Sequence, residues 1–158
     1  MEFVAFVTAL ALLEYAVFGM LVGRARGQYG VDAPATAGHP VFERYFRVHY
    51  NTMEQLVAFL PALWLFATYV NATWAGWLGL VFVVGRLAYL LGYVADPKRR
   101  EIGFALTAVP VVILLAGARL NWIMHFGRTP RFNPNVRVLQ LDLSPEQIGH
   151  NVPAEVGL

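Results

Sequence analysis

The chain of 158 residues has no cysteine and few charged residues. The absence of cysteine excludes a disulfide framework, a thiolate metal site and a cysteine nucleophile, although it does not identify the compartment. Only 14% of the residues are charged, against about 25% in a typical soluble domain. The net charge of +2 is too small to indicate nucleic-acid binding. We therefore expect neither a nucleic-acid partner nor a bound metal.

Hydrophobic residues make up 58% of the chain, and the mean hydropathy is +0.52. A soluble domain has about 45–50% apolar residues, so this composition indicates a small polytopic membrane protein. About 20 apolar residues span a bilayer, and four segments of this kind are Phe3–Val22, Val41–Val70, Trp74–Val94 and Ile102–Leu120. The first is too long for the apolar part of a signal peptide and follows no basic residue, so we interpret it as a transmembrane helix.

Three connections separate these segments. Glycine and proline punctuate the first, Arg24–Pro40, which we predict to be a loop. The second, Asn71–Thr73, is a short uncharged turn, and the third, Asp96–Glu101, is a charged loop. Basic residues lie in or beside the first and third connections, so the positive-inside tendency places both in the cytoplasm and both termini outside. We expect an integral protein of the inner (plasma) membrane of a bacterium.

A stripe of polar residues opens the second segment. Glu43, Arg47, Asn51 and Glu54 fall on one face of a helix at about 100° per residue. Ionisable side chains at membrane depth are costly, so by default they indicate a functional site, although they can instead pair with one another and hold the bundle together. Glu14, in the middle of the first segment, must face the interior, pair or stay protonated, and we interpret it as an interhelical contact.

The third segment carries a second polar group. Arg86, Tyr89 and Tyr93 are three and four residues apart, so they share one face of a helix. The glycines of this segment would let neighbouring helices approach closely. Arg100 follows in the third connection.

These residues resemble the pattern of a known family. The carrying sequences are Glu43-Arg44-x-x-Arg47-x-His49-x-Asn51-x-x-Glu54, Arg86-x-x-Tyr89-x-x-Gly92-Tyr93, and Arg100. Over about residues 1–117 the chain resembles the membrane-associated proteins in eicosanoid and glutathione metabolism. The resemblance implies an all-α polytopic membrane four-helix bundle, about residues 1–120, that forms homotrimers. It also implies that glutathione binds between adjacent subunits near the cytoplasmic side, which agrees with the loop charges.

The resemblance implies roles for individual side chains. Arg100 matches the arginine proposed to stabilise the glutathione thiolate, which makes it the candidate catalytic residue. Arg26 falls near a family arginine that contacts glutathione, but Arg24 competes for that alignment. The side chains expected to bind glutathione are Arg26, Arg47, His49, Asn51, Glu54, Arg86, Tyr89 and Tyr93. At Gln55 the chain departs from the leukotriene-synthesising members, which have tyrosine there, and this argues against an identical substrate.

The chemistry of glutathione suits such a site. Arginine is the natural bidentate partner of its carboxylates, and Glu54 can pair with its ammonium group. Its thiol, with an ordinary pKa near 8.5, is mostly protonated at neutral pH. A guanidinium such as that of Arg100 stabilises the thiolate for attack on a lipophilic electrophile that enters from the lipid. The alternatives are a non-catalytic lipid-binding scaffold of the same family and an inactive chimeric chain.

The last part of the chain has a different character. About residues 116–158 resemble a fragment of the central domain of thiamine-diphosphate enzymes, in particular 2-hydroxyacyl-CoA lyases and oxalyl-CoA decarboxylases. The carrying sequences are Gly117–Gly127, Pro130–Phe132, Val138–Asp142 and Glu146–Val152. The cofactor-binding part of those enzymes is absent, so the resemblance implies no thiamine diphosphate here.

Within this tail, Val136–Leu143 alternates like a strand and Ser144 is typical of a helix cap. One strand and one helical turn cannot bury a core, so we expect residues 121–158 to be weakly packed. We hypothesise that the chain joins two genes near Pro110–Gly117, where an apolar run suits either a membrane helix or a buried strand. The alternative is a divergent family member whose tail resembles the lyases by accident.

Overall fold

The computed structural model describes residues 1–116, 139–140 and 156–157. Most of the described chain is helical. The helices are α1 (Glu2–Tyr29), α2 (Pro40–Tyr69), α3 (Ala72–Ala95), the short 3-10 helix η1 (Pro97–Arg100) and α4 (Glu101–Ala116). Two strands of two residues each, β1 (Leu139–Gln140) and β2 (Val156–Gly157), pair in parallel.

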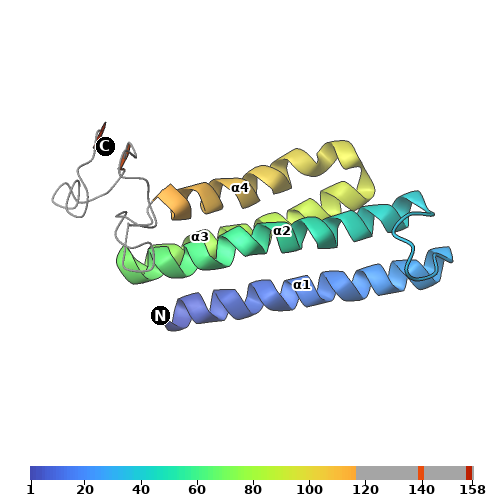
Figure 1. Ribbon diagram of the computed structural model, residues 1–158, viewed down its shortest axis with the longest axis horizontal. Coiled ribbons are helices and arrows are strands. Elements are labelled where there is room, and N and C mark those ends of the chain that lie inside the picture. The colour runs from blue at the N-terminus through green and yellow to red at the C-terminus, as the bar shows by residue number, and fades with distance from the viewer. Residues whose placement is uncertain (117–138, 141–155, 158) are drawn as a thin grey trace, which may run out of the picture.

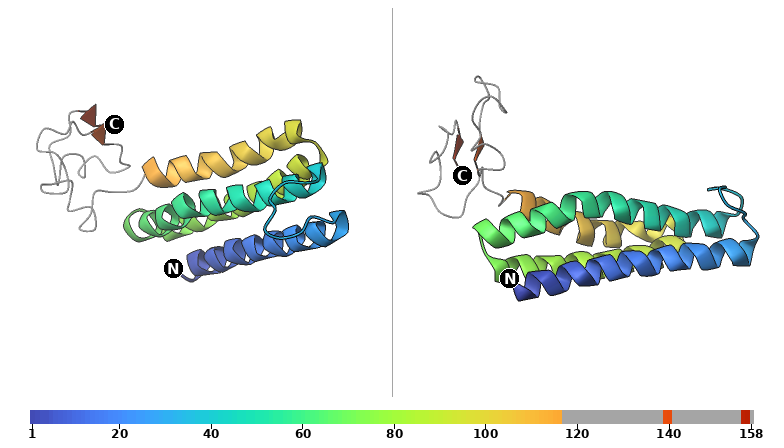
Figure 2. Two further views of the ribbon diagram at one scale, coloured as in Figure 1. Left: turned by 45° about the vertical axis from the view of Figure 1, so that its right-hand side comes forward. Right: turned by 60° about the horizontal axis from the view of Figure 1, so that its bottom comes forward.

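The four α-helices lie side by side and alternate in direction (Figures 1 and 2). α3 packs against the other three helices, and α2 also contacts α1 and α4. The α1–α2 connection and η1 lie at the same end of the bundle (Figure 1), which we call the loop end. The predicted all-α four-helix bundle is confirmed, and the two connections with basic residues come together at the loop end.

The tail prediction is tested at only a few positions. β1 confirms strand structure at Leu139 and Gln140, inside the predicted strand Val136–Leu143. The rest of that strand, the helix start at Ser144 and the predicted weak packing of residues 121–158 lie outside the described residues. The predicted fourth segment is helical from Glu101 to Ala116, and its last four residues are likewise outside them.

The first helix is longer than predicted. α1 continues through Arg24 and Arg26 to Tyr29, so the predicted loop is wrong over these residues. A glycine inside a helix costs about 1 kcal/mol relative to alanine, which weakens a helix without stopping it. α1 ends at Gly30, whose φ of 63° lies in the left-handed region that glycine adopts without strain. Both arginines therefore have positions fixed by a helix.

The turn between α2 and α3 is shorter than predicted, because Asn71 caps the next helix. Its side-chain oxygen accepts hydrogen bonds from the backbone N–H groups of Thr73 and Trp74, at 2.9 and 3.0 Å. These bonds satisfy donors that have no partner within the first helical turn. α3 consequently begins at Ala72, and the predicted turn over Asn71–Thr73 is wrong for its last two residues.

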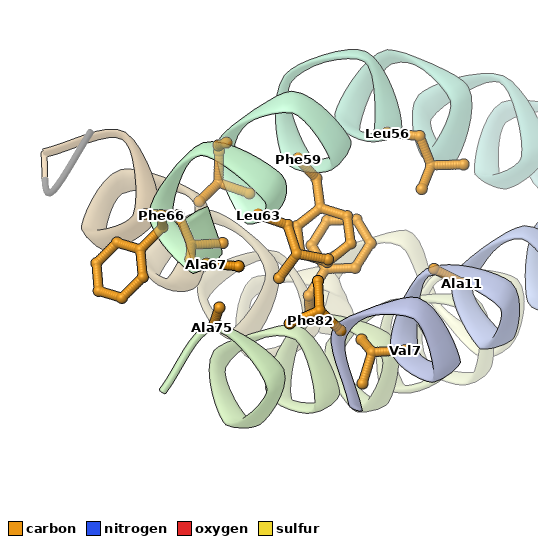
Figure 3. Packing of buried hydrophobic residues seen from close by; sticks show 13 residues of the cluster. Val7, Ala11, Leu56, Phe59, Leu63, Phe66, Ala67, Ala75 and Phe82 are labelled. Atoms are coloured by element: carbon orange, nitrogen blue, oxygen red, sulfur yellow. The ribbon is translucent and has the colours of Figure 1, made fainter. Parts of the chain in front are cut away.

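An apolar cluster fills the half of the bundle that is remote from the loop end. The rings of Phe59 and Phe82 stack with their centroids 3.7 Å apart. Val7, Ala11 and Leu63 pack around them and are buried (Figure 3). This packing joins α1, α2 and α3 and leaves the polar stripe of α2 to the other half.

Two of the described helices, α1 and α3, are long and apolar enough to cross a membrane. α2 has 30 residues but carries the polar stripe, and α4 is described over 16 residues. Many large apolar side chains of these helices are exposed on the outside of the bundle. A surface of this kind fits a lipid environment.

Glycines let α3 approach its neighbours closely, as predicted. A Cβ added to Gly85 would lie 2.8 Å from the carbonyl carbon of Leu106 in α4. From the other side, a Cβ on Gly103 of α4 would collide with the backbone of Tyr89. Because backbone cannot yield as a flexible side chain does, a methyl group at either position would push the two helices apart. The close approach of α4 holds Tyr89 in its place.

We expect Gly85→Ala to destabilise the protein, because the new methyl group would force α3 and α4 apart. Overpacking of this kind costs about 1–3 kcal/mol. The midpoint of thermal unfolding in detergent should fall by several degrees. Gly23→Ala is the matched control: it lies inside α1 with no heavy atom within 4 Å of the added Cβ. It should leave the midpoint unchanged or raise it, and equal losses in both variants would contradict the packing argument.

Candidate functional site

A pocket of about 700 Å³ opens at the loop end. Its walls come from the α1–α2 connection, the first turns of α2 and the end of α3. Glu43, Arg47 and Tyr50 line it from α2, and Tyr93 lines it from α3. The volume lies within the usual range for small-molecule sites. Charges of both signs in one open pocket favour a ligand that itself carries both signs.

A second, smaller pocket of about 300 Å³ is lined by Asn51, Tyr89, Arg100 and Phe104. These residues come from α2, α3, η1 and α4, so the folded bundle alone brings them together. The rings of Tyr89 and Tyr93 stack with their centroids 5.5 Å apart. Tyr89 lines the smaller pocket and Tyr93 the larger one, so the two pockets are neighbours. Arg100 is exposed at the mouth of the smaller one.

Arg86 lies behind the smaller pocket and has no exposed surface. Its Nε and Nη2 donate hydrogen bonds to the hydroxyl of Thr52, at 3.2 and 2.6 Å. Its Nη1 donates to the side-chain oxygen of Asn51 at 3.3 Å, and its Nη2 to the carbonyl of Val48 at 3.4 Å. The guanidinium carbon lies 4.4 Å from the centre of the Tyr89 ring. Arg86 therefore fixes both Asn51 and Tyr89 from behind.

The hydrogen bonds continue outward from Asn51. Its side-chain nitrogen donates to Oε2 of Glu54 at 3.1 Å, and Glu54 is exposed. Arg47, one turn before Asn51 on the same stripe, is exposed as well. These hydrogen bonds thus run from the buried guanidinium of Arg86 in α3, through Asn51, to the exposed carboxylate of Glu54 on the open face of α2.

Arg26 and His49, both expected to bind glutathione, lie elsewhere. Arg26 donates through Nη1 to the carbonyls of Val31 and Ala35, at 3.0 and 2.9 Å, and so holds the α1–α2 connection. His49 stacks on Tyr15 of α1 with ring centroids 4.4 Å apart. It therefore contacts a neighbouring helix. Neither side chain is among those that line the two pockets.

The sequence patterns did not predict the structural roles of two residues, Thr52 and Arg44. Thr52 accepts two of the hydrogen bonds of Arg86, and it is buried. The available signal was a lone hydroxyl on the apolar face of α2, one position after Asn51. Arg44 donates to the carbonyls of Val94 and Ala95 at the end of α3, at 3.0 and 3.2 Å. Its partners are 50 and 51 residues away in the sequence, so no local pattern indicates them.

Comparison with known protein families identifies this architecture. The model of the MAPEG family matches residues 4–120. The chain belongs to the MAPEG family. A second family model, for the central domain of thiamine pyrophosphate enzymes, matches residues 91–158 and overlaps the first match over residues 91–120. Both resemblances predicted from the sequence are confirmed, and the fold is an all-α polytopic membrane bundle.

Curated relatives support the assignment to the MAPEG family. The uncharacterized protein sll1147 of Synechocystis is 47% identical over 128 residues, which cover 81% of this chain and 93% of that protein. Human microsomal glutathione S-transferase 2 is 38% identical over 72% of this chain and 78% of its own length. Leukotriene C4 synthase of Cavia porcellus is 37% identical over 77% of this chain and 81% of its own length. The chain is thus similar to glutathione S-transferases over most of its described part.

We expect Thr52→Val to destabilise the protein, because valine keeps the shape of threonine and removes the hydroxyl that accepts from Arg86. A buried donor left without its partner costs about 1–3 kcal/mol. Thermal unfolding in detergent measures the loss. Thr52→Ser keeps the oxygen and should retain most of the wild-type stability. If the valine and serine variants unfold at the same temperature, Thr52 does not support the guanidinium.

Proposed function

We propose that the protein is a glutathione-dependent transferase or peroxidase that acts on lipophilic electrophiles within the membrane. One observation carries the proposal. Arg47, Asn51, Tyr89, Tyr93 and Arg100 come from three elements and line two neighbouring pockets at one end of an apolar bundle. The names of the relatives, glutathione S-transferase and leukotriene C4 synthase, support glutathione as the co-substrate.

The charges of the site match those of glutathione. Arg47, exposed at the larger pocket, offers a fork of donors to a carboxylate. Glu54 offers a carboxylate to the ammonium group and is oriented by Asn51. The two stacked tyrosines supply one hydroxyl group beside each pocket. The peptide part of glutathione then lies along α2, with its thiol directed toward Arg100.

Arg100 is the proposed catalytic residue. Its guanidinium stabilises the thiolate, which forms when the thiol releases its proton to water. In conjugation the thiolate sulfur forms a bond to an electrophilic carbon, and the leaving group departs with its electron pair. In the peroxidase reaction two glutathione thiols are oxidised to the disulfide while the O–O bond of a hydroperoxide is reduced to an alcohol and water. Both reactions need the same activated sulfur.

The open face of α2 supports the proposed homotrimer. Glu54, Ala58 and Pro61 are exposed along this face, beyond the residues that line the pockets. A neighbouring subunit seated there would close the site and shield it from lipid. The loop end carries the basic residues, so we place it in the cytoplasm of a bacterial cell, where glutathione reaches the site from water.

We also propose that the family domain covers residues 1–120 and that residues 121–158 are a tail of different origin. The overlap of the two family matches over residues 91–120 supports a junction inside an apolar run that suits both parents. The reading frame and the flanking DNA around codons 110–117 test this. Remnants of two genes are expected there, and related proteins that share the same tail would contradict it.

We expect Arg100→Ala to abolish turnover with only a modest loss of glutathione binding, because the guanidinium acts on the thiolate and not on the peptide backbone. Conjugation of glutathione to a chlorodinitrobenzene, followed by absorbance, measures turnover, and calorimetry in detergent measures binding. Arg99→Ala is the matched control: it removes an equal charge from the same short helix, at an exposed position that lines neither pocket.

The Arg99→Ala variant should keep wild-type activity. Full activity of Arg100→Ala would refute its catalytic role. Absence of glutathione binding to the wild-type protein would refute the proposed function and favour a lipid-binding scaffold or an inactive chain.

A further inference from the structure

Two apolar clusters follow one another along the bundle, and a polar residue of α1 lies between them. Ala11 belongs to the cluster remote from the loop end, and Phe18 belongs to the cluster nearer to it. Glu14 lies one helical turn from each, so it shares the side of α1 that faces the interior. A carboxyl group thus occupies a place where the pattern of the helix calls for an apolar side chain.

The same level of α3 and α2 is also polar. In α3, Phe82 belongs to the first cluster and Tyr89 to the second, and Arg86 lies between them. In α2, Thr52 lies between the members of the same two clusters. Glu14, Thr52 and Arg86 therefore form one polar layer across three helices, with apolar packing on both sides.

The charge of Arg86 has no counter-charge among its hydrogen-bond partners. They are a hydroxyl, an amide oxygen and a backbone carbonyl, all of them neutral. The other glutamates of the described helices, Glu2, Glu43, Glu54 and Glu101, are exposed. A guanidinium without exposed surface is costly unless an opposite charge lies near it.

The carboxyl group of Glu14 likewise lacks a partner. Its Oε2 atom is buried and makes no hydrogen bond to any described residue. The helices that carry Glu14 and Arg86, α1 and α3, pack against each other, and both residues lie between the same two clusters. A buried carboxylate without a partner is as costly as a buried guanidinium without one. Each group therefore supplies the opposite charge that the other lacks.

We propose that Glu14 is the counter-charge of Arg86 and, through Arg86, a positioning residue for the glutathione site. The positioning role rests on the proposed function. Arg86 donates to Asn51 and lies over the ring of Tyr89, and both of these line the smaller pocket beside Arg100. The position of the guanidinium thus decides the position of two pocket walls. Glu14, on the far side of the layer, holds that guanidinium without touching the ligand.

A double-mutant cycle on the full chain tests the pairing without reference to catalysis. Glu14→Gln and Arg86→Met should each lower the midpoint of thermal unfolding in detergent, because each leaves one buried charge alone. The midpoint of the double variant should be no lower than that of the less stable of the two single variants. Glu2→Gln, an exposed carboxyl of the same helix, should have no effect and should combine additively with Arg86→Met.

Additive losses for Glu14→Gln and Arg86→Met would overturn the pairing. If either single variant fails to fold, recovery of a folded double variant becomes the expected result, and failure to recover it overturns the proposal.

Steady-state kinetics test the positioning role. In Glu14→Gln, KM for glutathione should rise about five- to tenfold while kcat stays within about twofold, since the variant disturbs binding and leaves Arg100 in place. An unchanged KM, or a loss confined to kcat, would overturn this role. A wild-type protein that conjugates nothing would overturn the positioning role together with the proposed function. The double-mutant cycle measured by thermal unfolding would still decide whether Glu14 and Arg86 pair.

Discussion

Arg86 has no exposed surface, and the arrangement of α2 and α3 follows from the need to satisfy its guanidinium. The three nitrogens of its guanidinium must find acceptors inside an apolar bundle, because neither lipid nor a packed core supplies them. Thr52, Asn51 and the carbonyl of Val48 meet this need, and all three lie on one stretch of α2. The register of the two helices is thereby set at the level where the pockets begin.

Close packing between α3 and α4 adds to the constraint that the hydrogen bonds of Arg86 impose. α4 approaches α3 at Gly85 and Gly103, so the backbone around Tyr89 has little freedom. Tyr89 is held by this contact on one side and by the guanidinium of Arg86 on another. Apolar stacking around Phe59 and Phe82 secures the remote half of the bundle. The site at the loop end is consequently rigid at its base and open where charged residues reach the surface.

Much of the fold could be predicted from local patterns. Apolar segment lengths indicated four helices, and the polar stripe and the family pattern indicated which helices carry the site. Helix ends were less predictable. α1 continues through three glycines and stops at Gly30, because only there does the backbone turn left-handed. α3 starts early because Asn71 caps it. Both outcomes depend on the backbone geometry around single residues, which segment length and hydropathy do not specify.

The sequence by itself determined the class of the molecule: an apolar, helical membrane protein of the MAPEG family with a polar stripe, because hydropathy and helical spacing are properties of neighbouring residues. The tertiary structure decided which polar residues act together. It brought Asn51, Tyr89 and Arg100 to one pocket and set Arg26 and His49 apart from it. It also placed Glu14 and Arg86, 72 positions apart in the numbering, in one layer. Such distant contacts arise only when whole helices pack, since the register of one helix against another depends on all the side chains between them.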